Sequence, residues 1–151
     1  MSDDLKTRIQ DDVKAAMRAR DRARLGVLRL VTAAIKQKEV DDRTRLDDTA
    51  VLGVLEKMIK QRRDSRDQFV QAGRQELADQ ESFEIEVIQG YMPAALSASE
   101  VDALIEAAVA ETGAATMKDM GRLMGVLKPR LQGRADMGEV SARVKARLGP
   151  G

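Results

Sequence analysis

Apolar residues recur every three or four positions along almost the whole chain, and no stretch keeps the strict alternation typical of a half-buried strand. Leu5, Ile9, Val13 and Met17 step by four, behind Ser2 as a candidate N-cap. The same periodicity predicts helices around residues 5–17, 25–35, 51–69, 77–91, 101–109, 117–127 and 140–148. We therefore expect an all-α protein.

Polar residues mark where the first helices begin and end. Asp21 precedes the second helix, which we expect to end before Asp41-Asp42-Arg43 and to form an antiparallel hairpin with the first. Asp47 or Asp48 is the expected cap of the third helix. These short connections predict closely packed neighbouring helices.

The third helix continues into a very polar stretch, residues 60–67, before Gly73 introduces a break or a kink. Asp64 and Asp67 alternate with the bases at helical spacing, which favours ion pairs within the helix. We expect a solvated helix that projects from the core; a nucleic-acid-binding stripe is the alternative interpretation.

Pro93 ends the helical pattern, and residues 93–99 are small and uncharged, as in a linker. We expect a helical N-terminal domain at 1–92, a linker at 93–99 and a three-helix C-terminal domain at 100–151. In the second domain, Gly113 is an expected left-handed cap, and Asp136 with Glu139 resembles a capping box.

Composition excludes most catalytic chemistry. The 151 residues include no cysteine and no histidine, which removes thiol nucleophiles, thiolate or imidazole metal ligands and an imidazole base. Adjacent carboxylates such as Asp11-Asp12 diverge by about 100° on a helix, and Ser141 with Lys145 is best interpreted as a surface coincidence. We expect no catalytic residue, no metal and no cofactor.

No targeting segment is expected, because residues 2–4 are polar and acidic where a signal peptide would be basic. The longest uncharged stretch, residues 87–99, is too short to span a bilayer and contains Gly90 and Pro93. The sequence predicts a soluble, cytoplasmic protein without a membrane partner.

Charge is unevenly distributed along the C-terminal part. Residues 1–93 have no net charge, residues 94–117 carry −4, and residues 118–151 carry eight bases against three acids. A basic segment of this kind favours contact with nucleic-acid phosphates. The candidate nucleic-acid-binding residues are Lys118, Arg122, Lys128, Arg130, Arg134, Arg143 and Lys145.

Four residues of this segment suggest a structural motif. Gly121 and Gly125 lie four apart on one helix face, where a neighbouring helix or a ligand backbone can approach closely. Gly133 and Asp136 form either a plain cap and turn or, with Arg134, a loop whose N–H groups bind phosphate.

Methionines follow a second stripe of the same segment, at positions 117, 120 and 124. A stripe of this kind is used either for packing in the core or as an adaptable groove for a partner protein. Packing in the core is the favoured interpretation.

Blocks of sequence carry a resemblance over nearly the whole chain. The most specific are Lys118-Asp119-Met120-Gly121-Arg122-Leu123-Met124-Gly125 and Gly133-Arg134-Ala135-Asp136, and weaker blocks lie at 60–65, 72–74 and 91–93. In these blocks the chain resembles the GatB/YqeY family. The C-terminal part is similar to the tail domain of the B subunit of glutamine-dependent aspartyl/glutamyl-tRNA amidotransferase.

The resemblance implies a function in translation. In the larger enzyme the tail helps to hold tRNA, whereas kinase and amidotransferase chemistry belongs to other domains and subunits; the family label is carbon–nitrogen ligase with glutamine as amido-N-donor. We expect an accessory module that binds tRNA or structured RNA without catalysing chemistry itself. The alternatives are a protein-interaction module that docks on a tRNA-modifying or aminoacylating enzyme, and a participant in amide transfer that positions tRNA for partner subunits.

Overall fold

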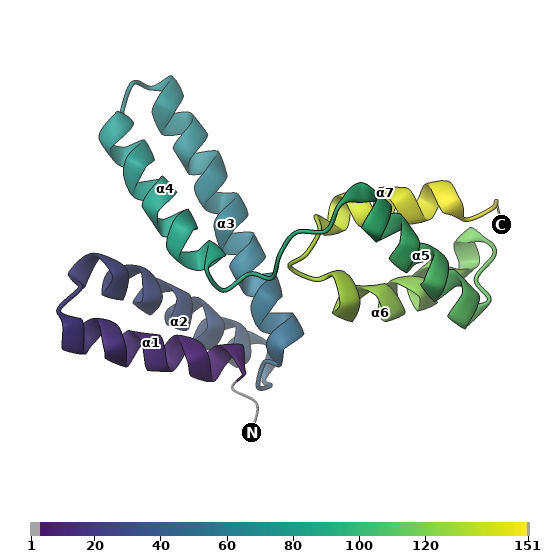
Figure 1. The fold of residues 1–151 in the computed structure, drawn as a ribbon, viewed down its shortest axis with the longest axis horizontal. Coiled ribbons are helices and arrows are strands. Elements are labelled where there is room, and N and C mark those ends of the chain that lie inside the picture. The colour runs from purple at the N-terminus through teal and green to yellow at the C-terminus, as the bar shows by residue number, and fades with distance from the viewer. Residues whose placement is uncertain (1–3, 151) are drawn as a thin grey trace. The chain divides into compact units, whose positions relative to one another are not determined.

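The computed structural model describes residues 4–150, which form seven α-helices and one short 3₁₀ turn (Figure 1). The predicted all-α fold class is confirmed for this part of the chain. By its contacts the chain divides into two compact units, Met1–Met92 and Pro93–Gly151. Independent folding of each unit stays a prediction.

The N-terminal unit consists of two helical hairpins. Its helices are α1 (Leu5–Ala19), α2 (Arg22–Asp42), α3 (Asp48–Gln71) and α4 (Gln75–Gln89). Figure 1 shows α1 antiparallel to α2, as predicted, and α3 antiparallel to α4. Apolar side chains of all four helices share one core, which is centred on Ile9, Leu28, Val51, Leu55 and Ile88.

Aspartates start three of these helices. Asp4, Asp21 and Asp47 each accept a hydrogen bond from the backbone N–H three residues later, at 2.7, 3.1 and 2.9 Å. Such a bond satisfies one of the donors left unpaired at a helix start. The predicted cap Ser2 lies outside the described residues, and the cap of α1 is Asp4.

The second helix continues further than the sequence predicts. It includes Asp41 and Asp42, and its C-cap is Arg43, which adopts the left-handed conformation with φ 53°. The backbone N–H of Arg43 bonds to the Val40 carbonyl, which closes the last turn. The charged side chains lie on the solvent side and therefore do not stop the helix.

The segment around Gly73 reverses the chain, so α3 and α4 form a hairpin and not one kinked rod. Gly73 has φ +71°, a value that glycine adopts without steric cost. Between residues 60 and 84 only Ala78 is buried. Arg62 Nε pairs with Glu84 Oε1 across the hairpin at 2.9 Å. The polar stretch of α3 is therefore one arm of a largely solvated hairpin, as its composition indicates.

Tyr91 ties the end of α4 back to α1. Its hydroxyl donates to Asp12 Oδ2 at 2.5 Å, and the Arg8 guanidinium lies 5.0 Å from the centre of its ring. Arg8 also donates to the Gly90 carbonyl at 3.2 Å. Tyr91 is only 4% exposed, and burial together with the Asp12 carboxylate raises the pKa of its hydroxyl to about 12.

The C-terminal unit packs three helices around a second core. Its elements are α5 (Ala98–Thr112), the 3₁₀ turn η1 (Met117–Asp119), α6 (Met120–Leu131) and α7 (Met137–Arg147). Helix α5 begins inside the predicted linker, because Ser97 and Glu100 form a capping box. Gly113 ends α5 in the predicted left-handed cap, with φ +69°.

Backbone hydrogen bonds connect the end of the C-terminal unit to the loop before η1. The Gly149 N–H donates to the Ala115 carbonyl at 2.9 Å, and the Gly149 carbonyl accepts from the Met117 N–H at 3.1 Å. A Cβ on Gly149 would lie 3.2 Å from the Ala115 carbonyl oxygen. Glycine therefore permits this close approach of two backbones.

Candidate nucleic-acid interface

One face of η1 and α6 is open to solvent and carries the glycines and bases of the sequence motif. We call it the glycine face, and its residues are Lys118, Gly121, Arg122, Gly125 and Lys128, all exposed. Apart from the neighbours Gly121 and Arg122, successive members are three residues apart, which places all five along one side of the helix. The opposite side buries Leu123, Leu127 and Leu131 in the core.

The two glycines of this face are not used for packing inside the described chain. Apart from the neighbouring residues and backbone of their own helix, no atom lies within 4 Å of the position that a Cβ would occupy on Gly121 or Gly125. Pro129 has no N–H to donate to the Gly125 carbonyl, which therefore lacks its usual helical partner. The face offers backbone to an incoming group without shielding by side chains.

The bases of the glycine face keep most of their charge available. Lys118 and Lys128 make no ion pair with any residue from 4 to 150. Arg122 pairs with Asp119 Oδ1 at 3.2 Å, but its side chain stays 57% exposed. Asp119 also accepts the Ala115 and Thr116 N–H groups, and these bonds lower the pKa of its carboxyl. The Asp119 carboxylate thus bonds mainly to backbone N–H groups and only secondarily to Arg122.

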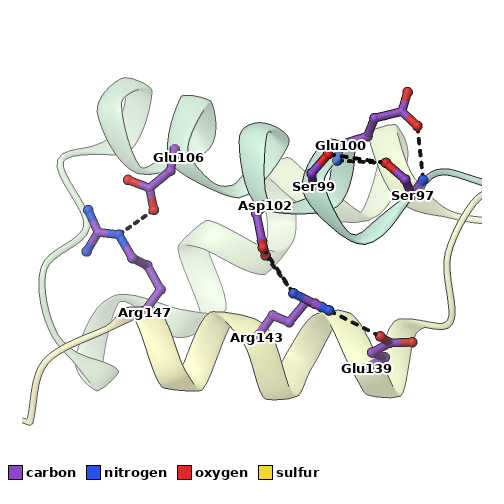
Figure 2. Close-up of polar contacts among 8 residues, drawn as sticks. All are labelled: Ser97, Ser99, Glu100, Asp102, Glu106, Glu139, Arg143 and Arg147. Atoms are coloured by element: carbon purple, nitrogen blue, oxygen red, sulfur yellow. Dashed lines mark hydrogen bonds and ion pairs between the residues drawn. The ribbon is translucent and has the colours of Figure 1, made fainter.

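Two arginines of α7 form ion pairs with acids of α5 (Figure 2). Arg143 Nη1 lies 3.0 Å from both carboxylate oxygens of Asp102, and Arg147 pairs with Glu106. The bond to Glu106 raises the pKa of Arg147. Both pairs join residues 41 positions apart, so α5 and α7 run in the same direction with their charges in register.

These ion pairs correct the picture of separate acidic and basic segments. The C-terminal unit contains eight bases and seven acids, so its net charge is only +1. Arg130, a further candidate, pairs with Glu111 at 2.9 Å. Sequence reasoning missed this neutralisation, although Asp102 and Glu106 have the same spacing of four as Arg143 and Arg147.

The loop between α6 and α7 is a cap and turn. Gly133 has φ +82°, and the N–H groups of Arg134 and Ala135 both donate to the Leu131 carbonyl, at 2.9 and 3.2 Å. Asp136 accepts the Gly138 N–H at 3.1 Å and starts α7. Its carboxylate occupies the place at the helix start where a phosphate would bind.

Two predictions about this loop change accordingly. The expected capping box does not form, since Glu139 instead lies 3.6 Å from Arg143 Nη2. Arg134 is half-buried, and its carbonyl accepts the Leu96 N–H at 2.8 Å. Its charge helps to lower the pKa of Glu100, which is lowered mainly by hydrogen bonds from Ser97. Arg134 is therefore less available to phosphate than the sequence suggests.

The other candidate residues take different positions. Lys145 is exposed on α7 and has no ion pair in the described part of the chain. Met120 and Met124 pack partly buried against the core, as favoured, whereas Met117 is exposed. Among residues 4–150 there is no cluster of three acidic side chains suited to a metal ion. No helix in that range is long and apolar enough to cross a membrane.

Similarity to known proteins covers both units. The chain matches the family described as Yqey-like protein over residues 6–148. It is 38% identical over 102 residues to "Altered inheritance of mitochondria protein 41, mitochondrial" of Eremothecium gossypii, an alignment covering 66% of this chain and 56% of that protein. The protein of the same name from Pyrenophora tritici-repentis is 30% identical over 148 residues, which cover 94% of this chain and 80% of that protein.

A third relative of that name, from Kluyveromyces lactis, is 38% identical over 100 residues, which cover 64% of this chain and 54% of that protein. The chain thus spans little more than half the length of the Eremothecium and Kluyveromyces proteins. The names of these relatives refer to mitochondria, and the cytoplasmic location of this chain stays a prediction. The match over 6–148 identifies the family: the chain belongs to the YqeY-like protein family.

Proposed function

We propose that this chain is an accessory module that binds tRNA or another structured RNA through the glycine face, without catalysing chemistry itself. The observation that supports it is the combination of open backbone and available charge on one helix side. Apart from the neighbouring residues and backbone of their own helix, Gly121 and Gly125 have no contact within 4 Å of a Cβ position. Lys118, Arg122 and Lys128 flank them and are exposed.

Phosphate is the group that suits such a face. A missing side chain lets a phosphodiester backbone approach the helix closely, and flanking cations then form charge-assisted hydrogen bonds with its oxygens. The only aromatic residues are Phe69, Phe83 and Tyr91, all in the N-terminal unit, so the face has no ring on which a base could stack. Recognition would rest on phosphates and on the shape of the RNA.

Of the seven bases that the sequence suggests for binding nucleic acid, the proposal retains Lys118, Arg122 and Lys128. Arg130 and Arg143 would have to leave Glu111 and Asp102 before they could bind phosphate. Among the described residues, Lys118 and Lys128 have no ion pair to give up, and Arg122 would give up only its exposed contact with Asp119. The similarity of the C-terminal part to a tRNA-holding tail supports RNA as the ligand, and the proposal extends to binding alone, not to the amide transfer of the family label.

Binding of fluorescent bulk tRNA, measured by anisotropy across a salt series, tests the proposal. The variant Lys118→Gln/Arg122→Gln/Lys128→Gln removes three cations and keeps helix-forming side chains. Its log–log salt dependence should be shallower by about two to three units, because each phosphate contact contributes about one. The control Lys57→Gln/Lys60→Gln/Arg63→Gln removes the same charge from exposed positions of α3.

A second variant separates binding from folding. Gly125→Gln places a bulky side chain on the face, and glutamine forms helices more readily than glycine. We expect unchanged or raised stability together with weaker tRNA binding. Equal salt dependence of the wild type and the glycine-face variant, or no tRNA binding at low salt, would contradict the proposal. Docking on a tRNA-modifying or aminoacylating enzyme would then be the favoured function.

A further inference from the structure

The α1–α2 hairpin of the N-terminal unit has two adjoining hollows on one side. The larger, about 490 Å³, lies between the helices and is lined by residues that include Lys6, Arg29 and Lys36. The smaller, about 390 Å³, lies towards the α1–α2 turn and is lined by residues that include Arg20 and Arg22. Arg29 lines both hollows, and we call the two together the basic groove.

The lining of the basic groove is strongly positive. It contains five bases and a single acid, Glu39. Both carboxylate oxygens of Glu39 accept from Lys6 Nζ, at 2.9 and 2.7 Å, and one also accepts the Leu46 N–H at 2.9 Å. These bonds lower the pKa of Glu39, which stays ionised and cancels Lys6. Four positive charges of the groove therefore remain.

The four remaining bases have no acid of their own. Arg20, Arg22, Arg29 and Lys36 make no ion pair or side-chain hydrogen bond with the described residues. Three other acids of the hairpin have partners that do not line the groove: Asp12 accepts from Tyr91, Asp21 caps α2 through the Arg24 N–H, and Asp42 pairs with Lys38. Neither these acids nor Asp11 and Asp41 line the two hollows.

The bases of α2 form a regular row. Arg22, Arg29 and Lys36 are seven residues apart, which is nearly two helical turns, so their backbones lie on one side of the helix about 10 Å from one another. A row of separated cations beside a groove matches a ligand that is itself a chain of anions. A single phosphate would use one of these bases, whereas a phosphodiester backbone would use the row.

We propose that the basic groove binds the phosphate backbone of a double-helical region of nucleic acid. Neither hollow is lined by an aromatic residue that would stack on an unpaired base, so a base-paired region is the favoured ligand. A flat lipid surface would meet only the rim of a groove between two helices, so the backbone of a nucleic acid is the favoured polyanion. The proposal rests on the proposed function only for RNA as the choice of nucleic acid.

The glycine face and the basic groove together predict a stronger salt dependence of RNA binding. With contacts on both units, the salt dependence of RNA binding should exceed what the glycine face alone provides, because counterions are released at each surface. The variant Arg22→Gln/Arg29→Gln/Lys36→Gln should be folded, since these side chains are exposed at the helix surface. Circular dichroism and melting temperature establish folding before binding is measured.

The experiment compares three charge-matched variants of the full chain: the basic-groove variant, the glycine-face variant and the α3 control. The probes are bulk tRNA and a blunt RNA duplex of about 20 base pairs, titrated across a salt series. We expect the basic-groove variant to lose about two to three units of salt dependence and roughly ten- to a hundredfold in affinity at low salt. The α3 control should lose clearly less on both probes.

Losses in both variants that exceed the loss in the α3 control would support both surfaces. Loss in the basic-groove variant alone supports this inference and contradicts the glycine face, whereas loss in the glycine-face variant alone does the reverse. Equal losses in the basic-groove variant and the α3 control would reduce the effect to net charge and overturn the inference. So would binding to anionic lipid vesicles or to an acidic protein that needs the groove, if the same variant bound both RNAs as the wild type does.

Discussion

Polar contacts between helices are placed differently in the two units. In the N-terminal unit, Arg62 and Glu84 have side chains only 16% and 13% exposed, and the Tyr91 hydroxyl is buried against Asp12. In the C-terminal unit, Arg143 and Asp102 are 32% and 56% exposed. Contacts of the first kind join helices with little exposure to water, whereas contacts of the second kind lie on the surface.

This difference in exposure decides which charges of each unit remain available to a ligand. Removing one partner of a buried contact leaves the other without solvent, so such contacts matter for stability. An exposed ion pair contributes little to stability but cancels charge that a polyanion would otherwise meet. In the C-terminal unit this cancellation leaves the glycine face. In the N-terminal unit the basic groove keeps its charge because, among the described residues, only Lys6 of its five bases pairs with an acid.

The largest expected effect tests whether the two units are separate at all. Leu127→Ala removes a fully buried side chain from the C-terminal core and should cost that unit about 2–5 kcal/mol. Leu55→Ala is the matched change in the N-terminal core. Thermal unfolding followed by circular dichroism should show two transitions, each lowered by one variant. A single transition lowered by both variants would show that the units unfold together.

Tyr91→Phe should destabilise the N-terminal unit by about 1–3 kcal/mol, since it leaves the Asp12 carboxylate without its buried donor. Asp12→Asn keeps an acceptor for the hydroxyl and should cost less. Urea unfolding of both variants measures the difference. If Tyr91→Phe were neutral, the contact would belong with the exposed pairs and the contrast between the units would weaken.

Tyr91 also predicts a loss of stability in alkali. Its pKa is raised from 10.0 to about 12, because burial and Asp12 disfavour the phenolate. The protonated hydroxyl thus contributes stability that is fully present below pH 10 and is lost as the pH rises towards 12. Tyr91 is the only tyrosine and the chain has no tryptophan, so phenolate absorbance reports it alone. Tyr91→Phe should lack this part of the alkaline dependence; an ordinary titration near pH 10 would refute the burial of the hydroxyl.

Gly125→Ala should raise the stability of the C-terminal unit by about 0.5–1 kcal/mol, because the position is helical and open. Gly149→Ala is the contrasting control, since its Cβ would press on the Ala115 carbonyl and should destabilise the unit. Melting temperatures of the two variants give the comparison. Destabilisation by Gly125→Ala would indicate that something packs on the glycine face.

Apolar periodicity was sufficient to predict the helices. Aspartates before apolar runs predicted a start at Asp21 and another at Asp47 or Asp48, of which Asp47 is the cap. Periodicity did not predict the α3–α4 hairpin, because Gly73 is compatible with a kink or with a reversal. Nor did it predict the contact of Tyr91 with Asp12, residues that are 79 positions apart. Local patterns specify elements, whereas such pairs depend on how the elements pack.

The candidate site shows the same limit. The spacing of Gly121 and Gly125 predicted a shared helix face, but only packing decides whether the face is covered or open. Counting charges along the sequence exaggerated the basic segment, because the acids of α5 lie beside it. The zero net charge of residues 1–93 conversely concealed the row from Arg22 to Lys36. Net charge of a segment is therefore a poor guide to the charge of a surface.

The smallest expected effect concerns the exposed ion pairs themselves. Arg143→Gln should change the stability of the C-terminal unit by less than about 1 kcal/mol, because its contacts with Asp102 and Glu139 are exposed to water. A double-mutant cycle with Asp102→Asn measures the coupling, which should shrink further in high salt. A coupling above about 2 kcal/mol would place this pair with the buried contacts. A small coupling would leave cancellation of charge on the C-terminal unit as the main effect of the pair. Because Asp102→Asn leaves Arg143 only its longer contact with Glu139, this variant should then strengthen tRNA binding slightly.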